Sequence, residues 1–161
     1  MRKSLLAAFL LAAGCGQGSV PSNGAGENRV VTAPTPVQTA TLTGLYESAG
    51  PAPSQLCITG QGRAARFGLV TRRNGRPGCS GAGTATRSGT ILRLAMDGES
   101  GCTIEARLEG GRLTFPASLP RGCSYYCAPE AEAGAIIFTK TGGTSADARR
   151  ARDIVGDPLC G

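Results

Sequence analysis

The sequence predicts a mainly β protein: a small antiparallel meander or barrel-like domain, braced by disulfides and carrying one helix near its C-terminus. Three observations support this prediction. Apolar and polar residues alternate with period two in several segments after residue 41, as they do in half-buried strands. Glycine-containing turn signals separate those segments. Glycine is abundant and aromatic residues are scarce, so the core is small and needs covalent support.

The strands are expected where the alternation is clearest. Segment 90–96 places Leu92, Leu94 and Met96 on one face. In segment 102–108 the residues that face the core are Ile104, Ala106 and Leu108. Three shorter stretches have the same spacing, namely Phe67 with Leu69, Leu113 with Phe115, and Ile136 with Phe138. The turn signals between such stretches predict hairpin after hairpin, and they are Asn74-Gly75, Ser88-Gly89, Asp97-Gly98 and Gly110-Gly111.

The C-terminal part of the chain predicts a helix near 145–155. This segment is rich in alanine and arginine and contains no proline. Thr144 or Ser145 can serve as the N-cap, and Asp147 favours the first turn through the helix dipole. The helix is expected to end at Gly156, with Cys160 pinning the tail. A narrow apolar stripe is expected to lie on the barrel, and it comprises Ala148, Ala151, Ile154 and Val155.

Six cysteines after residue 15 predict three disulfides, and they are Cys57, Cys79, Cys102, Cys123, Cys127 and Cys160. The first four are 22, 23 and 21 residues apart, which fits one hairpin per interval with a cysteine at one end of every second strand. Successive cysteines of this series can pair only if the sheet curls or they lie in end loops. Cys123 and Cys127 can bridge each other only across a turn or a helical segment. The pairing stays open among fifteen possibilities.

The N-terminus carries an export signal. Arg2 and Lys3 precede an apolar run, and the run ends in Leu11-Ala12-Ala13-Gly14-Cys15. This stretch resembles the lipobox of bacterial lipoproteins, with Ala12 where leucine is preferred. The resemblance covers residues 1–15 alone and implies a signal peptide over 1–14 with a lipid on Cys15. A secretory signal cut elsewhere is the alternative, whereas the apolar run is far shorter than the roughly 20 residues that cross a bilayer.

The remaining chain divides into two parts. Residues 15–40 are expected to hold the lipidated cysteine and a disordered tether rich in glycine, proline and polar residues. Residues 41–161 are expected to form a single β-rich domain. The resemblance implies that the lipid anchors this domain in the cell envelope. Gly16 stands where inner-membrane lipoproteins of enteric bacteria carry aspartate, which favours the outer membrane.

The composition argues against several classes of activity. The chain contains no histidine, which excludes Ser-His-Asp and Cys-His catalytic groups and histidine metal sites. We therefore expect no enzyme, no cofactor and no metal. A cell-wall hydrolase would need paired carboxylates, for which the candidates are Glu47, Glu105, Glu109, Asp153 and Asp157. Net charge falls from +6 to +4 once Arg2 and Lys3 leave, and no nucleic-acid partner is expected in this compartment.

Binding is the function that the sequence favours. Tyr125 and Tyr126 lie between two cysteines. Because adjacent residues on a strand point to opposite faces, one ring is expected in the core and the other exposed as a contact. The densest basic stretch offers a surface for an envelope protein or an anionic glycan, through Arg66, Arg72, Arg73 and Arg76. We expect a membrane-anchored module for such a partner. The alternative is a lipocalin-like carrier of a small apolar ligand, with space left by Gly81, Ala82, Gly83 and Ala85.

Overall fold

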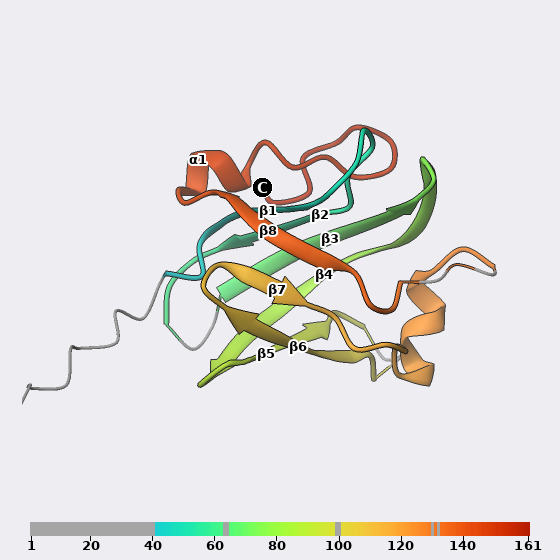
Figure 1. Cartoon of the computed structure of the whole chain (residues 1–161), viewed down its shortest axis with the longest axis horizontal. Coiled ribbons are helices and arrows are strands. Elements are labelled where there is room, and N and C mark those ends of the chain that lie inside the picture. Colours follow the sequence, from blue (N-terminus) through green and yellow to red (C-terminus); the bar gives the residue numbers. More distant parts are fainter. Residues whose placement is uncertain (1–40, 63–64, 99–100, 130, 132) are drawn as a thin grey trace, which may run out of the picture. The chain divides into compact units, whose positions relative to one another are not determined.

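The computed structural model describes residues 41–62, 65–98, 101–129, 131 and 133–161. These residues form one closed antiparallel barrel in which every strand pairs with the next and β1 pairs with β8 (Figure 1). The mainly β, barrel-like fold predicted from the sequence is confirmed. The signal peptide predicted over 1–14, and Cys15 with the tether predicted over 15–40, lie outside the described residues. The strands are β1 Gly44–Ser48, β2 Gln55–Thr59, β3 Ala65–Arg73, β4 Arg76–Ser88, β5 Ile91–Met96, β6 Thr103–Glu109, β7 Arg112–Thr114 and β8 Ile137–Gly142.

The barrel interior is filled by the residues that alternation placed there. On β5 and β6 every inward position predicted from the sequence is buried, from Leu92 to Leu108. Phe115 and Phe138 meet in this core with ring centroids 5.1 Å apart and planes at 54°. Because alternate residues of a strand point to opposite faces, one run of alternation specifies both the core and the solvent surface.

Glycine turns close the hairpins. Asn74 (φ 51°) and Gly75 (φ 77°) form the two-residue loop between β3 and β4, and Gly110 (φ 55°) and Gly111 (φ 80°) join β6 to β7. Positive φ at both central positions belongs to the turns whose twist matches that of paired strands. The predicted turns at these dipeptides are confirmed.

The small residues on β4 do not leave empty space inside the barrel. An ideal Cβ on Gly83 would lie 2.0 Å from the Ala95 carbonyl oxygen and 2.8 Å from the Phe67 ring. At Gly81 the nearest atoms are the Met96 sulfur at 3.0 Å and the Tyr126 ring at 3.2 Å. The space over these two glycines is therefore occupied by neighbouring side chains and backbone.

The C-terminal helix is much shorter than predicted. Helix α1 spans Ser145–Ala148 only, although Thr144 is the N-cap, as predicted, and forms a capping box with Asp147. The Asp153 carboxylate accepts backbone N–H groups of Val155 and Asp157, at 2.8 and 2.9 Å. This local capping competes with helical hydrogen bonds, so the chain turns instead of extending the helix to residue 155.

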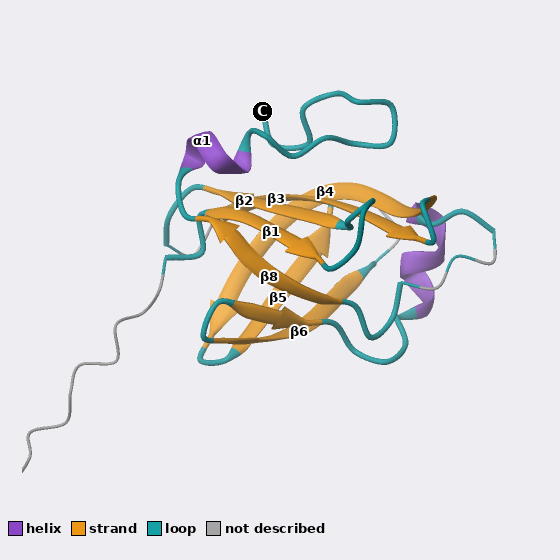
Figure 2. Ribbon diagram, turned by 45° about the horizontal axis from the view of Figure 1, so that its top comes forward, coloured by secondary structure: helices purple, strands orange, loops and turns teal. Residues whose placement is uncertain are grey.

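The chain after α1 forms a structured loop on the outer wall of the barrel, which we call the strap (residues 149–160; Figure 2). Ala151 is buried in it, whereas Ile154 and Val155 are exposed, so the predicted apolar stripe is wrong for these two residues. The strap packs on β3, where a Cβ on Gly68 would lie 2.4 Å from the Leu159 carbonyl oxygen. Its end is bonded to β2 through Cys57 and Cys160.

All six cysteines in the described part of the chain form disulfides, as Cys57–Cys160, Cys79–Cys127 and Cys102–Cys123. Cys57, Cys79 and Cys102 lie on or directly before β2, β4 and β6, so the spacing does follow every second strand. Cys57 departs from the expectation because it lies in the middle of its strand and faces the strap. Cys102 and Cys123 are successive members of the series, and both lie outside the strands. In the part of the chain that the structure describes, no helix has the length and apolar character needed to span a membrane.

Candidate functional site

The candidate site is built around a 3₁₀ helix, η1 (Arg121–Tyr126), which two disulfides hold on the barrel. Cys123 within it bonds to Cys102, and Cys127 directly after it bonds to Cys79 on β4. Backbone contacts add to this link, since the Ala128 N–H donates to the Gly78 carbonyl at 2.9 Å. A helix of this length is marginal by itself, so the covalent links fix the position of its side chains.

The two tyrosines of η1 lie in different environments. Tyr125 is 82% exposed. Tyr126 packs against the core and donates its hydroxyl to the Asp97 carbonyl. The rings meet edge to face with centroids 5.3 Å apart. The sequence predicted different environments for the two rings because it placed them on a strand. The environments do differ, but the residues lie on a 3₁₀ helix, where the wide angle between successive side chains separates the rings.

A groove of about 750 Å³ opens beside η1. It is lined by the end of β3, by the segment between β7 and η1, and by the loop that follows η1. Arg73 and Arg121 contribute the cationic side chains among the described lining residues, and Leu119, Pro120 and Ala133 contribute apolar surface. Glu130 and Glu132 belong to the same loop in sequence but fall outside the described residues.

Arg121 was not among the binding residues predicted from the sequence. The sequence does place it between Pro120 and Gly122, two residues before Cys123, the first of the two cysteines that hold η1. A basic residue in a loop of that kind is presented on a rigid support, but nothing in the local pattern shows that Arg73 from a distant hairpin lies across the same groove.

The four arginines predicted to form one binding surface do not all lie together in the structure. Arg66 forms a salt bridge with Asp97, whose pKa this guanidinium lowers, chiefly through their hydrogen bond. Arg72 lies six residues away, roughly 20 Å along an extended strand, and donates Nη2 to the Asp153 carbonyl at 3.1 Å. Arg73 and Arg76 pair across the β3–β4 turn, as expected. Of the four, Arg73 lines the groove.

Four of the five carboxylates proposed for a hydrolase have structural partners. Glu105 pairs with Arg93 at 2.7 Å, and Glu109 with Arg107 at 3.2 Å. Glu47 on β1 accepts from the Gln55 amide and the Thr141 hydroxyl, each at 2.8 Å. The Asp153 carboxylate caps the strap, where the Asp157 backbone donates to it and accepts from the Asp153 N–H. Among the described residues, no group of three or more histidine, cysteine or acidic side chains is arranged to hold a metal.

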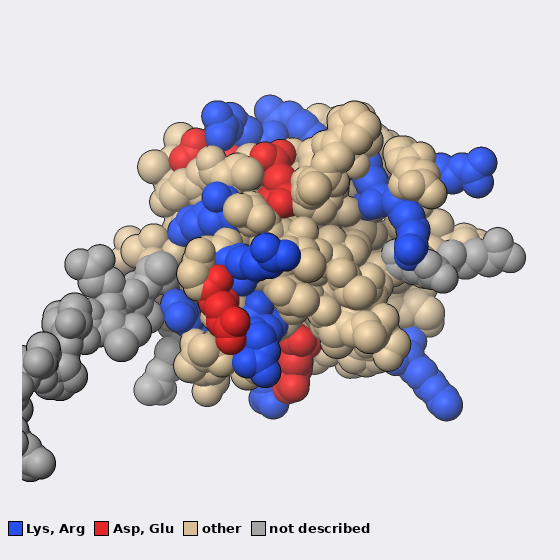
Figure 3. All heavy atoms as spheres, in the orientation of Figure 1, with Lys and Arg blue, Asp and Glu red and all other residues tan. Residues whose placement is uncertain are grey.

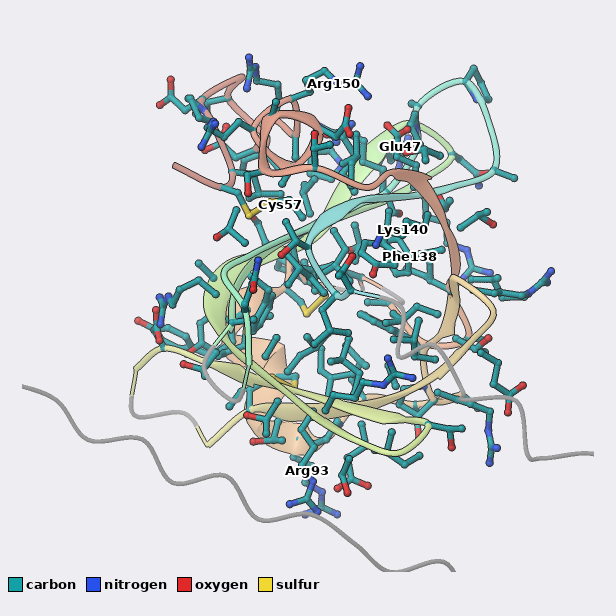
Figure 4. The ribbon with its side chains drawn as sticks, turned by 90° about the vertical axis from the view of Figure 1, so that its left-hand side faces the viewer. Glu47, Cys57, Arg93, Phe138, Lys140 and Arg150 are labelled. Carbon is teal, nitrogen blue, oxygen red and sulfur yellow. A yellow bond between two sulfur atoms is a disulfide. The ribbon has the colours of Figure 1, made fainter. Side chains whose placement is uncertain are left out.

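Lys140 and Tyr46 occupy the barrel near the paired ends of β1 and β8. Phe138 and Lys140 lie on the inner side of β8 (Figure 4). The Lys140 ammonium lies 5.5 Å from the centroid of the Tyr46 ring, and the Tyr46 hydroxyl donates to the Leu42 carbonyl at 2.8 Å. Burial raises the pKa of Tyr46 to about 12, an effect that the charge of Arg87 partly offsets.

This raised pKa predicts alkaline destabilisation. The neutral phenol is favoured in the folded state, so its contribution, on the order of 2 kcal/mol, is complete below pH 10 and is lost as pH rises through 12. Tyr46→Phe removes this loss and costs about 1 kcal/mol at neutral pH through the missing hydrogen bond. Urea midpoints of both proteins measured from pH 8 to 12 provide the check.

The difference between the two proteins is the quantity to follow, because burial lowers the pKa of Lys140 and adds its own pH dependence to both. Equal slopes above pH 10 would contradict the assignment to Tyr46.

Fold and site together define a filled, closed β barrel that presents a disulfide-held helix beside an open groove. No protein-family model matches this chain, and comparison with the curated proteins and with the solved structures finds no match either. The function is therefore argued from the residues of the site.

Proposed function

We propose that this protein is a lipid-anchored lipoprotein of the cell envelope, in the outer membrane, and that its barrel is a binding module for an envelope protein. The partner binds across η1 and the adjacent groove. The observation that carries the proposal is Tyr125, which is 82% exposed on a helix that two disulfides fix in place. An exposed tyrosine on a rigid support binds with little loss of conformational entropy.

The chemistry of the groove supports a protein partner. Tyrosine and arginine are the residue types that concentrate binding energy at protein interfaces. Here Tyr125 lies on η1, and the guanidinium groups of Arg73 and Arg121 line the groove, among proline, leucine and alanine surface. Acidic groups on the partner would complement these two arginines, and an apolar segment would cover the remaining lining.

The barrel interior favours surface recognition over the carrier alternative. Side chains from successive strands form one buried cluster inside it, including Tyr46, Phe67 and Phe138. The small residues expected to leave space are covered at Gly81 and Gly83 by Met96 and Phe67. A carrier would need to move these side chains to admit a ligand.

Photo-cross-linking in the producing bacterium tests the proposal. A benzoylphenylalanine at position 125 is expected to capture a discrete partner, and Arg121→Glu in the same chain is expected to abolish the capture. With the partner identified, Tyr125→Ala is expected to weaken its binding on the order of 30-fold, the effect of one interface hot spot. Isothermal calorimetry on the purified pair measures this factor.

Two controls make the result specific. The cross-linker at Ile137, which is 39% exposed on β8, reports chance encounters, and Arg107→Glu on β6 matches the charge change away from η1. Equal capture from positions 125 and 137 would contradict the proposal. In native mass spectrometry of the full chain, a small-molecule adduct lost on denaturation would instead favour the carrier.

A further inference from the structure

The strap presents an apolar tip that lies outside the proposed binding surface at η1 and the groove. Ile154 and Val155 are adjacent in the chain and are 51% and 77% exposed. Among the described residues, only two other large hydrophobic side chains are exposed, Tyr125 on η1 and Ile137 on β8. An exposed pair of aliphatic side chains at a loop tip is a feature of surfaces that contact apolar partners.

The loop that carries this tip is ordered by its own hydrogen bonds. The Asp153 N–H donates to the Asp157 carbonyl at 2.9 Å, and the Leu159 N–H donates to the Ala151 carbonyl at 3.0 Å. The Asp153 carboxylate is occupied by two backbone N–H groups from within the loop. The disulfide to Cys57 fixes the far end. The two aliphatic side chains are thus held outward by the fold.

Arginines flank the tip. Arg149, Arg150 and Arg152 are all exposed at the start of the strap. Figure 3 shows basic side chains along the edge of the molecule formed by α1 and the strap. Asp147 pairs with Arg150 at 3.1 Å, and the Asp153 carboxylate accepts two backbone N–H groups within the loop. Apolar residues flanked by cations match the boundary between acyl chains and anionic headgroups.

The point where the tether joins the domain lies beside α1. Thr41 and Thr43 line one small pocket together with Thr144 and Ser145, at the start of the helix that leads into the strap. The described part of the chain begins at Thr41, so the strap lies on the side of the barrel at which the preceding residues join it.

We infer that Ile154 and Val155 insert at the surface of an anionic phospholipid bilayer, with Arg149 and Arg150 contacting the headgroups. The inference goes beyond the proposed function, since it assigns a second contact that orients the barrel on the membrane. A lipid on Cys15 alone leaves that orientation undefined, whereas a second contact at the strap sets which face of the barrel is turned toward the lipid.

Tryptophan fluorescence tests this contact, because the chain has no tryptophan of its own. The full chain carrying Val155→Trp is reconstituted in vesicles of phosphatidylcholine and phosphatidylglycerol with brominated acyl chains. Emission is expected to shift to shorter wavelength and to be quenched by bromine. The same chain carrying Ile137→Trp, on β8, is expected to show neither change, and it controls for the affinity of tryptophan itself for the interface.

The flanking arginines and the apolar tip are then changed separately in the Val155→Trp protein. Arg149→Glu with Arg150→Glu, or omission of phosphatidylglycerol, is expected to reduce quenching. Ile154→Asp is expected to abolish it. Urea midpoints close to that of the wild type establish that the variants fold. Unquenched emission at position 155, or equal quenching at 155 and 137, would overturn the inference, and quenching insensitive to both charge changes would overturn the role of the arginines.

Discussion

Replacing Cys57 and Cys160 together by alanine is expected to lower the free energy of unfolding by about 4 to 5 kcal/mol. This disulfide closes the longest loop in the protein, with a sequence separation of 103 residues, and so restricts the unfolded chain most. It also holds the strap against β2, where Leu45, Cys57, Ala148 and Ala151 form a small buried cluster. Urea denaturation of the variant and the wild type, followed by circular dichroism, measures the change.

The disulfide between Cys102 and Cys123 is the matched control. Its separation is 21 residues, for which the same chain-entropy argument gives a loss of about 3 kcal/mol. The order of the two losses is the informative result. A loss below about 1 kcal/mol for the Cys57 and Cys160 pair would mean that the strap separates from the barrel without destabilising it.

Phe138→Ala is expected to cost about 3 to 5 kcal/mol. The ring is fully buried on β8 and packs against Phe115 at 5.1 Å between centroids, so truncation removes apolar burial and leaves a cavity at the centre of the barrel. The urea midpoint, with an unchanged slope, gives the loss directly.

Ile137→Ala on the same strand provides the comparison. Its side chain is 39% exposed on the outer face, and a loss of about 0.5 kcal/mol is expected. Similar losses for the two variants would contradict the assignment of these neighbours to opposite faces of β8.

The strands and their turns were predictable because their causes are local. Alternation at period two sets which side chains of β5 and β6 are buried, and positive φ at Asn74-Gly75 and Gly110-Gly111 sets the hairpins. Closure of the barrel followed from the same pattern, since consecutive hairpins with one apolar face each bury that face by curling together.

The helix was predicted too long because a competing local interaction was overlooked. Alanine and arginine favour a helix over 145–155, but Asp153 lies where its carboxylate can cap the N–H groups of Val155 and Asp157. The turn that results brings Cys160 to Cys57. A continuous helix would have carried the chain away from β2, so the disulfide and the turn support each other.

The disulfide pairing and the groove could not be predicted from the sequence because both depend on contacts between distant segments. Cys123 and Cys127 are four residues apart, yet each bonds to a different distant cysteine. The groove joins residues of three separate segments, and only Arg73 among its described lining residues belonged to the predicted binding set. The exposed tyrosine was the part of the site that local reasoning could find.

Closure of the barrel has a consequence for how copies of this protein coexist. Every described strand has a hydrogen-bonded neighbour on both sides, from the pairing of β1 with β2 to that of β8 with β1. An open sheet offers an unpaired backbone edge on which a second molecule can add its own strand and begin a polymer. The lipid anchor proposed above would confine the molecules to two dimensions, where crowding favours such growth. A ring of strands without ends can be packed densely on a surface and stay a population of separate molecules.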